Sequence, residues 1–150
     1  MKFKIGKILL VMVLSLDSLL CFSSDFYWNG TTDITPTAWN AAVNWKVNNA
    51  VATTSPTAAD NIYFNITNTY NWSIQNTISF NQLFINQGVV ISLNTVNPLM
   101  DGLVIINGGI LNGTYPISPC TLTVRALNIQ NNGTIISGKY SVNVTNGDIL

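Results

Sequence analysis

Charged side chains are scarce in this chain, which limits the acid–base chemistry that it can perform. The 150 residues include 6 basic residues, 6 acidic residues and no histidine. In the second half the acids are Asp101 and Asp148, and the bases are Arg125 and Lys139. Cleavage of a polysaccharide needs paired carboxylates for hydrolysis, or a base beside an acid for elimination. Only Asp101 and Arg125 have a spacing that could bring them together, and this spacing predicts a surface ion pair.

Other reactive side chains are equally isolated. Beyond the first two dozen residues Cys120 is the single cysteine, and without histidine it lacks the usual base of a cysteine nucleophile. Asp60 stands among amides and hydroxyls, and one carboxylate is too little for a calcium site. We therefore expect no catalytic residue, no metal site and no cofactor, and we expect Cys120 to be a half-buried small hydrophobe. The zero formal charge gives no reason to expect a nucleic-acid partner.

The first residues have the pattern of an export signal. MKFKIGK is a positively charged start, and ILLVMVLSL is an apolar run that Asp17 keeps too short for a membrane span. Cleavage near Ser23 is the first choice, so residues 1–23 are interpreted as a signal peptide. The alternatives are a lipid on Cys21, although Leu20 before it is a poor fit, and a retained anchor. The mature chain is expected to be secreted or on the cell surface, without a membrane span.

Composition favours strands over helices. The chain is 47% hydrophobic and contains 21 asparagines and no glutamate. Asn, Thr and Ser prefer turns, caps and strands to helix interiors. A chain of this length has room for one domain, and it is too apolar to be a disordered polar tract.

The second half contains a repeat. ISFNQLFINQGVVI (78–91) aligns with LTVRALNIQNNGTII (122–136), so that Ile78, Phe80, Leu83 and Ile85 correspond to Leu122, Val124, Leu127 and Ile129. Halfway between, Leu99, Val104 and Ile106 repeat the pattern, with Asp101 opposite Phe80. Glycines follow each copy, at Gly88, Gly109 and Gly133. The last copy, VNVTNGDIL (142–150), arrives early.

Apolar residues two apart, followed by Asn-Gly corners, predict short half-buried strands joined by sharp turns. A period of 21 to 24 residues predicts a solenoid, and a right-handed parallel β-helix fits best. Ile85, Ile106 and Ile129 are expected to stack inside it, and corner asparagines could form hydrogen-bonded ladders. A β-sandwich built from hairpins is the structural alternative. The coils are assigned to residues 74–150, and the early last copy predicts that they continue and that an open final coil self-associates.

Residues 24–73 contain all four tryptophans, at positions 28, 39, 45 and 72. The first coil of a β-helix has an open core and an unpaired edge, which need a cap. Trp and Tyr bury a large apolar area and keep a polar tip for the backbone. We interpret this segment as an aromatic N-terminal cap with the first strands. Pro56 is expected to begin a turn, and Asp60 to accept backbone N–H groups before a strand at Asn61–Asn65.

The order FYWNG, AWNAAVNW and PTAADNIYF resembles the start of large secreted bacterial surface proteins, including adhesin-like and autotransporter-like β-helix proteins. There a tryptophan pair with an NW step precedes a Pro-x-x-x-Asp-x-hydrophobic-x-Phe stretch, and β-helix coils follow. The positions that match are Trp28, Trp39, Asn44, Trp45, Pro56, Asp60, Ile62 and Phe64. The match covers residues 26–64, and NGTTDITPTAW stands where those proteins often have a glycine-rich approach.

These features predict a non-catalytic stalk or adhesin scaffold that contacts glycans or extracellular surfaces through an uncharged Asn/Thr-rich face. The first alternative is a carbohydrate-binding module in which Trp39, Trp45 or Tyr63 stacks on sugar rings. The second is the non-catalytic start of a longer polysaccharide-active enzyme. The exposure of the tryptophans distinguishes the cap from the sugar platform.

Overall fold

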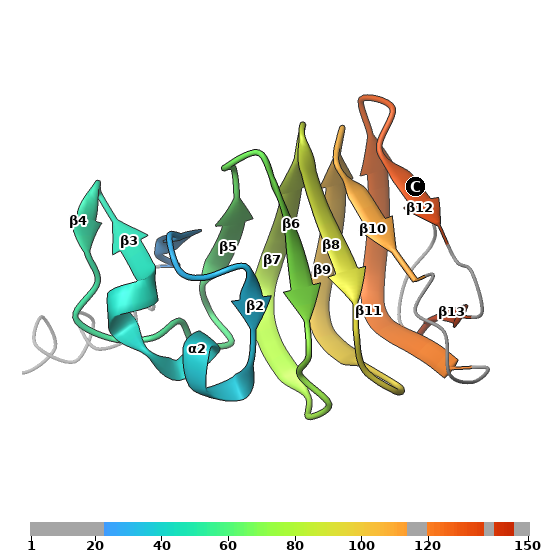
Figure 1. Cartoon of the computed structure of the whole chain (residues 1–150), viewed down its shortest axis with the longest axis horizontal. Helices are drawn as coiled ribbons and strands as arrows, with labels where there is room; N and C mark the ends of the chain where they lie inside the picture. The colour runs from blue at the N-terminus through green and yellow to red at the C-terminus, as the bar shows by residue number, and fades with distance from the viewer. Residues whose placement is uncertain (1–22, 114–119, 137–139, 146–150) are drawn as a thin grey trace, which may run out of the picture.

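The structure, a computed structural model, describes residues 23–113, 120–136 and 140–145. The described chain folds as a parallel β-solenoid of about three turns. Its two sheets run along the long axis of the molecule and share one core (Figure 1). The predicted β-helix is therefore confirmed. The sandwich alternative is wrong, because successive strands of the repeat pair in parallel rather than as hairpins.

The strands form one sheet of eight and one of five. In spatial order the larger sheet contains β13 (Tyr140–Val144), β11 (Cys120–Gln130), β9 (Leu99–Asn107), β7 (Ile78–Asn86), β5 (Asn61–Phe64), β1 (Asp25–Trp28), β3 (Trp45–Val47) and β4 (Ala50–Val51). The smaller sheet contains β12 (Thr134–Ile136), β10 (Ile110–Asn112), β8 (Val89–Leu93), β6 (Asn68–Trp72) and β2 (Asp33–Ile34). The described helices are α2 (Pro36–Asn40) and the 3-10 helix η1 (Ala42–Asn44), and neither is long and apolar enough to cross a membrane.

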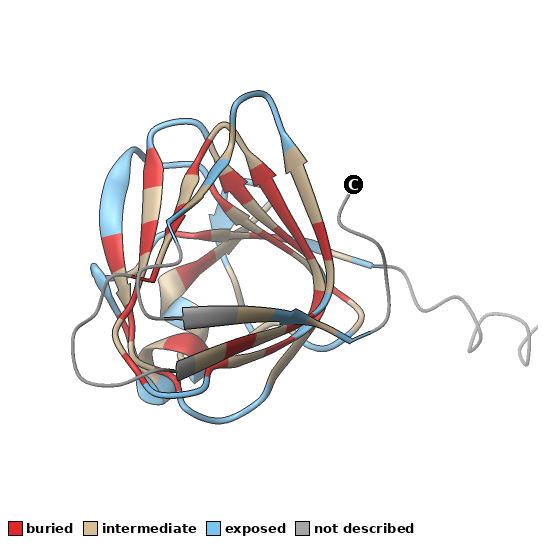
Figure 2. Ribbon diagram, turned by 90° about the vertical axis from the view of Figure 1, so that its right-hand side faces the viewer, coloured by how far each residue is buried: buried red, intermediate tan, exposed pale blue. Residues whose placement is uncertain are grey.

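The interior ladders follow the repeat. Ile85 lies beside Ile106 in the neighbouring strand, and Ile106 lies beside Ile129 in the next. Ile85 and Ile106 are buried, and the half-buried Ile129 packs against the same core. Viewed along the long axis, the coils close into a ring, and buried and half-buried positions alternate along their strands (Figure 2). The predicted inward stack of isoleucines is confirmed.

The corner before each ladder differs from the prediction. Ile78 lies beside Met100, and Met100 beside Val124, where the repeat predicted Leu99 and Leu122 as partners. The register shifts between Ser79 and Gln82, because β7 and β9 bend around the corner with unequal numbers of residues. Strict alternation of apolar residues cannot reveal such a bulge.

Gly102, rather than Asp101, lies against Phe80. A Cβ atom on Gly102 would be 2.2 Å from Cδ2 of the Phe80 ring, so this ring fills the space of a missing side chain. Asp101 lies beside Ser79 instead and is exposed. The expected opposition of Phe80 and Asp101 is therefore wrong by one position.

The turns between the sheets use positive φ angles. Gly88 has a φ of 81°, and its equivalent is Gly108 with a φ of 74°, since Val90 pairs with Ile110. The predicted equivalence of Gly88 and Gly109 is therefore off by one residue. In the next turn Asn131 and Asn132 adopt φ angles of 49° and 64°. Asparagine tolerates this region better than most side chains do, so the NNG corner replaces a glycine turn.

An excursion of residues 36–60 interrupts the solenoid between β2 and β5. Thr35 caps α2 by accepting a hydrogen bond from the Ala38 N–H at 3.1 Å, and Pro36 opens the helix. The chain then forms the antiparallel hairpin β3–β4, whose two turn residues, Asn48 and Asn49, have φ angles of 51° and 65°. Because β3 also pairs with β1, this hairpin extends the larger sheet at its N-terminal end.

Candidate functional site

Trp45 is the centre of a buried aromatic cluster near the N-terminal end. Its ring centroid lies 4.7 Å from that of Trp28 and 4.9 Å from that of Trp39, both in edge-on geometry, and 6.2 Å from Phe26. Its indole Nε1 donates to the Trp39 carbonyl at 2.7 Å. The apolar ring thus packs against other rings inside the fold, and its N–H group has a hydrogen-bond acceptor.

The cluster joins the excursion to the coils. Trp39 from α2 contacts Trp72 on β6 at a centroid distance of 5.5 Å. Trp28 on β1 contacts Phe64 on β5 at 5.8 Å, and Phe64 contacts Tyr70 at 5.3 Å. We call these seven residues the aromatic cluster: Phe26, Trp28, Trp39, Trp45, Phe64, Tyr70 and Trp72. The expected gathering of aromatic residues near the first coils is confirmed.

Burial removes two of the three residues suggested for sugar stacking. Trp39 is 3% exposed and Trp45 is 0% exposed. Sugar rings stack on the open face of an aromatic side chain, and neither indole presents one. The structure therefore contradicts a sugar platform at these two positions.

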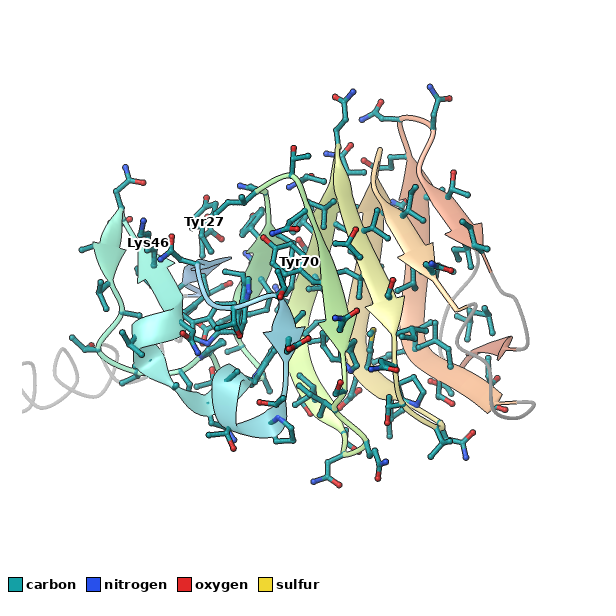
Figure 3. The ribbon with its side chains drawn as sticks, viewed as in Figure 1. Tyr27, Lys46 and Tyr70 are labelled. Carbon is teal, nitrogen blue, oxygen red and sulfur yellow. The ribbon has the colours of Figure 1, made fainter. Side chains whose placement is uncertain are left out.

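The third suggested residue, Tyr63, lies on the outer side of the larger sheet. Its ring stacks on Tyr27 at 4.8 Å with an interplanar angle of 18°, and on Phe84 at 4.5 Å with an angle of 2°. We call Tyr27, Tyr63 and Phe84 the outer column. Both faces of Tyr63 are covered by its neighbours, so a sugar could reach only the ring edge. Lys46 lies beside Tyr27 on the neighbouring strand (Figure 3).

Polar side chains form a chain of hydrogen bonds across the same three strands. Asn61 Nδ2 donates to Asp25 at 2.9 Å, and Asn81 Nδ2 donates to Asn61 at 2.9 Å. Asp25 also affects Tyr63. The pKa of the Tyr63 hydroxyl is raised above its ordinary value of 10.0, chiefly because the group is partly buried. The charges of Asp25 and Tyr27 and a hydrogen bond with Asp25 raise this pKa further. Tyr63 therefore stays protonated at neutral pH.

We expect this shift to make the fold sensitive to alkali. A tyrosine whose folded pKa is raised contributes stability that is complete below the unfolded pKa and is lost as the pH rises through the folded pKa. The wild type should therefore lose more stability above about pH 10 than Tyr63→Phe, which has no hydroxyl. Urea unfolding at pH 8 and at high pH measures this difference. Equal losses in both proteins would contradict the assignment.

One corner of the solenoid carries an asparagine ladder, formed by Asn65, Asn86, Asn107 and Asn131. Asn86 Nδ2 donates to Asn65, Asn107 Nδ2 donates to Asn86 at 2.7 Å, and Asn131 Nδ2 donates to Asn107 at 2.6 Å. Each amide has one donor and one acceptor aligned with the stack, so the same residue repeats from coil to coil. The expected ladder of corner asparagines is confirmed.

Asp60 and its neighbours have structural partners. Asp60 is 7% exposed and accepts hydrogen bonds from the backbone N–H groups of Thr57 at 2.8 Å and Ser24 at 2.9 Å, and from the Thr57 hydroxyl at 2.7 Å. Pro56 directly precedes this turn. Asn44 Nδ2 donates to the Ala38 carbonyl at 2.9 Å, which joins η1 to α2. The predicted acceptance of backbone N–H groups before the strand is confirmed, although the strand ends at Phe64 rather than Asn65.

The predicted pair of Asp101 and Arg125 is present at the surface. Arg125 Nε lies 3.8 Å from Asp101 Oδ1, with the side chains 45% and 50% exposed. Such a pair contributes little to stability.

Within the described ranges, no three His, Cys, Asp or Glu side chains gather as metal ligands would. Residues 1–22 of the predicted signal peptide, which include Cys21, lie outside the described residues, as do Asp148 and the side chain of Cys120.

Sequence reasoning missed the outer column, although a signal was available. Tyr63 and Phe84 are 21 positions apart, which is also the spacing of Asn65, Asn86 and Asn107. A repeat of this length governs the outward positions of the strands as well as the inward ones. Comparison with family models, with curated proteins and with solved structures gives no match to this chain.

Proposed function

We propose that this protein is an exported, non-catalytic β-solenoid scaffold that serves as a stalk or adhesin at or beyond the cell surface. The observation that carries the proposal is the asparagine ladder, which holds successive coils in one register with neutral side chains. A scaffold of this kind presents the same outward positions at a fixed interval. The basic and apolar start of the chain supports export.

The adhesive face that we propose is the outer side of the smaller sheet. Asn71, Ser92 and Asn112 lie side by side there on β6, β8 and β10, and all three are half-buried. We call them the polar row. Asn71 also donates to Asp33 at 2.9 Å, which fixes its amide. Hydroxyl and amide groups at the spacing of strands suit repeated hydrogen bonds to a glycan or another neutral extracellular polymer.

The resemblance of FYWNG, AWNAAVNW and PTAADNIYF to the beginning of adhesin-like and autotransporter-like proteins supports the same function. Residues of that motif are buried together near the N-terminal end, which supports the proposal that they form a cap. Trp28, Trp39, Trp45 and Phe64 belong to the aromatic cluster, and Asp60 holds the turn before β5. In this proposal the excursion covers the open core and edge of the first coil, and the stacked coils give the stalk its length.

Fractionation and adsorption test the proposal. The full chain should leave the cytoplasm, whereas a chain without residues 1–23 should remain inside.

The exported protein should adsorb to insoluble polysaccharides or to extracellular matrix without releasing reducing ends. Ser92→Arg places a charged side chain in the polar row and should reduce adsorption, while Gln82→Arg on the other sheet should not. Loss of adsorption in Tyr63→Ala alone would favour the carbohydrate-binding module, and released reducing ends would contradict a non-catalytic role.

A further inference from the structure

Ser24 is held at both of its backbone polar groups by the beginning of β5. Its N–H donates to Oδ1 of Asp60 at 2.9 Å, and its carbonyl accepts from the N–H of Asn61 at 2.9 Å. Asp60 directly precedes β5, and Ser24 directly precedes β1, which pairs with β5. The contact therefore joins the first strand to the point where the excursion returns to the solenoid.

Asp60 carries a charge in a place that offers only neutral donors. The carboxylate is 7% exposed, and its three hydrogen-bond donors are two backbone N–H groups and one hydroxyl. The cationic side chains described on the neighbouring strands do not pair with it, and the ion pair found in the described residues is that of Asp101 and Arg125. A buried carboxylate is most stable when a cation joins its hydrogen bonds.

We propose that the Ser23–Ser24 peptide bond is the processing site of this chain and that the α-ammonium released there is the missing counter-ion of Asp60. This inference rests on the proposed export. Water adds across the peptide bond, its C–N bond breaks, Ser23 leaves with the carboxylate, and the Ser24 amine takes up a proton. The donor of the hydrogen bond to Asp60, at first a neutral amide, then becomes a cationic ammonium, so that both partners of the bond are ionised.

The surroundings of Ser24 suit both steps. Ser23 is exposed, and the bond to be cut joins it to Ser24, whose N–H is held by Asp60. A hollow of about 310 Å³ borders Ser24 and is lined by Phe26, Val47, Val51, Ala52 and two threonines. It leaves room for water beside Ser24. Processing at this bond thus completes the contact between β1 and β5.

The first test is the N-terminus of the exported full chain, measured by intact mass and N-terminal sequencing. A start at Ser24 is the expected result. An exported chain that begins at a lipid-modified Cys21 or elsewhere would overturn this inference and leave export intact. A chain that stays inside the cell with Met1 would overturn export and, with it, this inference.

The second test measures the ion pair without relying on the natural peptidase. Two proteins differ by one residue: one begins at Ser24, and the other begins at Ser23, which keeps a neutral amide at Ser24. We expect the protein that begins at Ser24 to melt about 3–6 °C higher. Acetylation of its amine should remove this advantage.

Asp60→Asn completes the cycle, because it should make the two starting points melt at the same temperature. If that variant does not fold, the acetylated and free amines of the wild-type sequence still give the comparison. Equal melting temperatures for the Ser23 start, the Ser24 start and the acetylated protein would overturn the pairing. An advantage for Ser24 that persists in folded Asp60→Asn would overturn it as well.

Discussion

Replacing Trp45 by alanine is expected to lower the free energy of unfolding by about 3–5 kcal/mol. The substitution removes a fully buried ring that touches Phe26, Trp28 and Trp39 within the aromatic cluster. It also leaves the Trp39 carbonyl without its indole donor. The excursion and the first coil meet at this ring, so a cavity here loosens both. Thermal and urea unfolding followed by circular dichroism would measure the loss.

Val43→Ala provides the matched control, since Val43 lies two residues away and is exposed. Surface changes of this kind alter stability by less than about 0.5 kcal/mol. If Trp45→Ala melted at the wild-type temperature but lost adsorption to glycans, the ring would be a binding residue and its burial in the aromatic cluster would be refuted.

Ile106→Asn is expected to cost several kcal/mol, because a polar amide would enter an apolar ladder. Ile106 is fully buried, with Ile85 on one side and Ile129 on the other. Gly133 packs against it so closely that a Cβ atom there would be 2.8 Å from Cγ2 of Ile106. The residues in register with it on β7 and β11 are isoleucines, so neither of these neighbours could pair with the new amide. Equilibrium unfolding in urea would quantify the effect.

The same substitution at Ile66 is the control, since this isoleucine is exposed in the turn after β5. Ile66→Asn should change stability by less than about 0.5 kcal/mol. Similar values for the two variants would mean that position 106 does not face the core, and the register of β7, β9 and β11 would then be incorrect.

The interior of the solenoid could be predicted because burial imposes one rule on every coil. Positions 83, 104 and 127, and positions 85, 106 and 129, face the same core, so their apolar character recurs at nearly constant spacing. The corners obey a weaker rule. Phe80 enters the core only because Gly102 leaves space for it, and a glycine in a sequence does not indicate which neighbouring ring will use that space.

At the N-terminal end the gathering of aromatic residues could be predicted, whereas the arrangement of the strands could not. The spacing of Trp28, Trp39 and Trp45 indicated a cluster, and the rings do meet. The antiparallel hairpin β3–β4 beside β1 was not foreseen, because Asn48-Asn49 gives a turn without identifying the strand that its hairpin joins. The contact between Ser24 and Asp60 spans 36 positions and depends on where the excursion returns, which local patterns do not show.

The outer surface was the least predictable part. The type of its side chain alone suggests that Tyr63 stacks on sugar rings. Its environment is set by Tyr27 and Phe84, which come from two other strands. An outward side chain is constrained by neighbours across strands rather than by a core, so its role emerges only once the register is known.

The spacing of the asparagine ladder also shows how much longer each coil would become if it unfolded. Asn65, Asn86 and Asn107 mark coils of 21 residues. Each coil advances the long axis by one strand spacing, about 4.8 Å. The same 21 residues would span roughly 70 Å if drawn out straight. The hydrogen bonds between coils point along that axis, so tension between the two ends pulls directly on these bonds. A coil that opens would therefore lengthen the chain by more than ten times its folded height, and a solenoid under tension would extend in large steps.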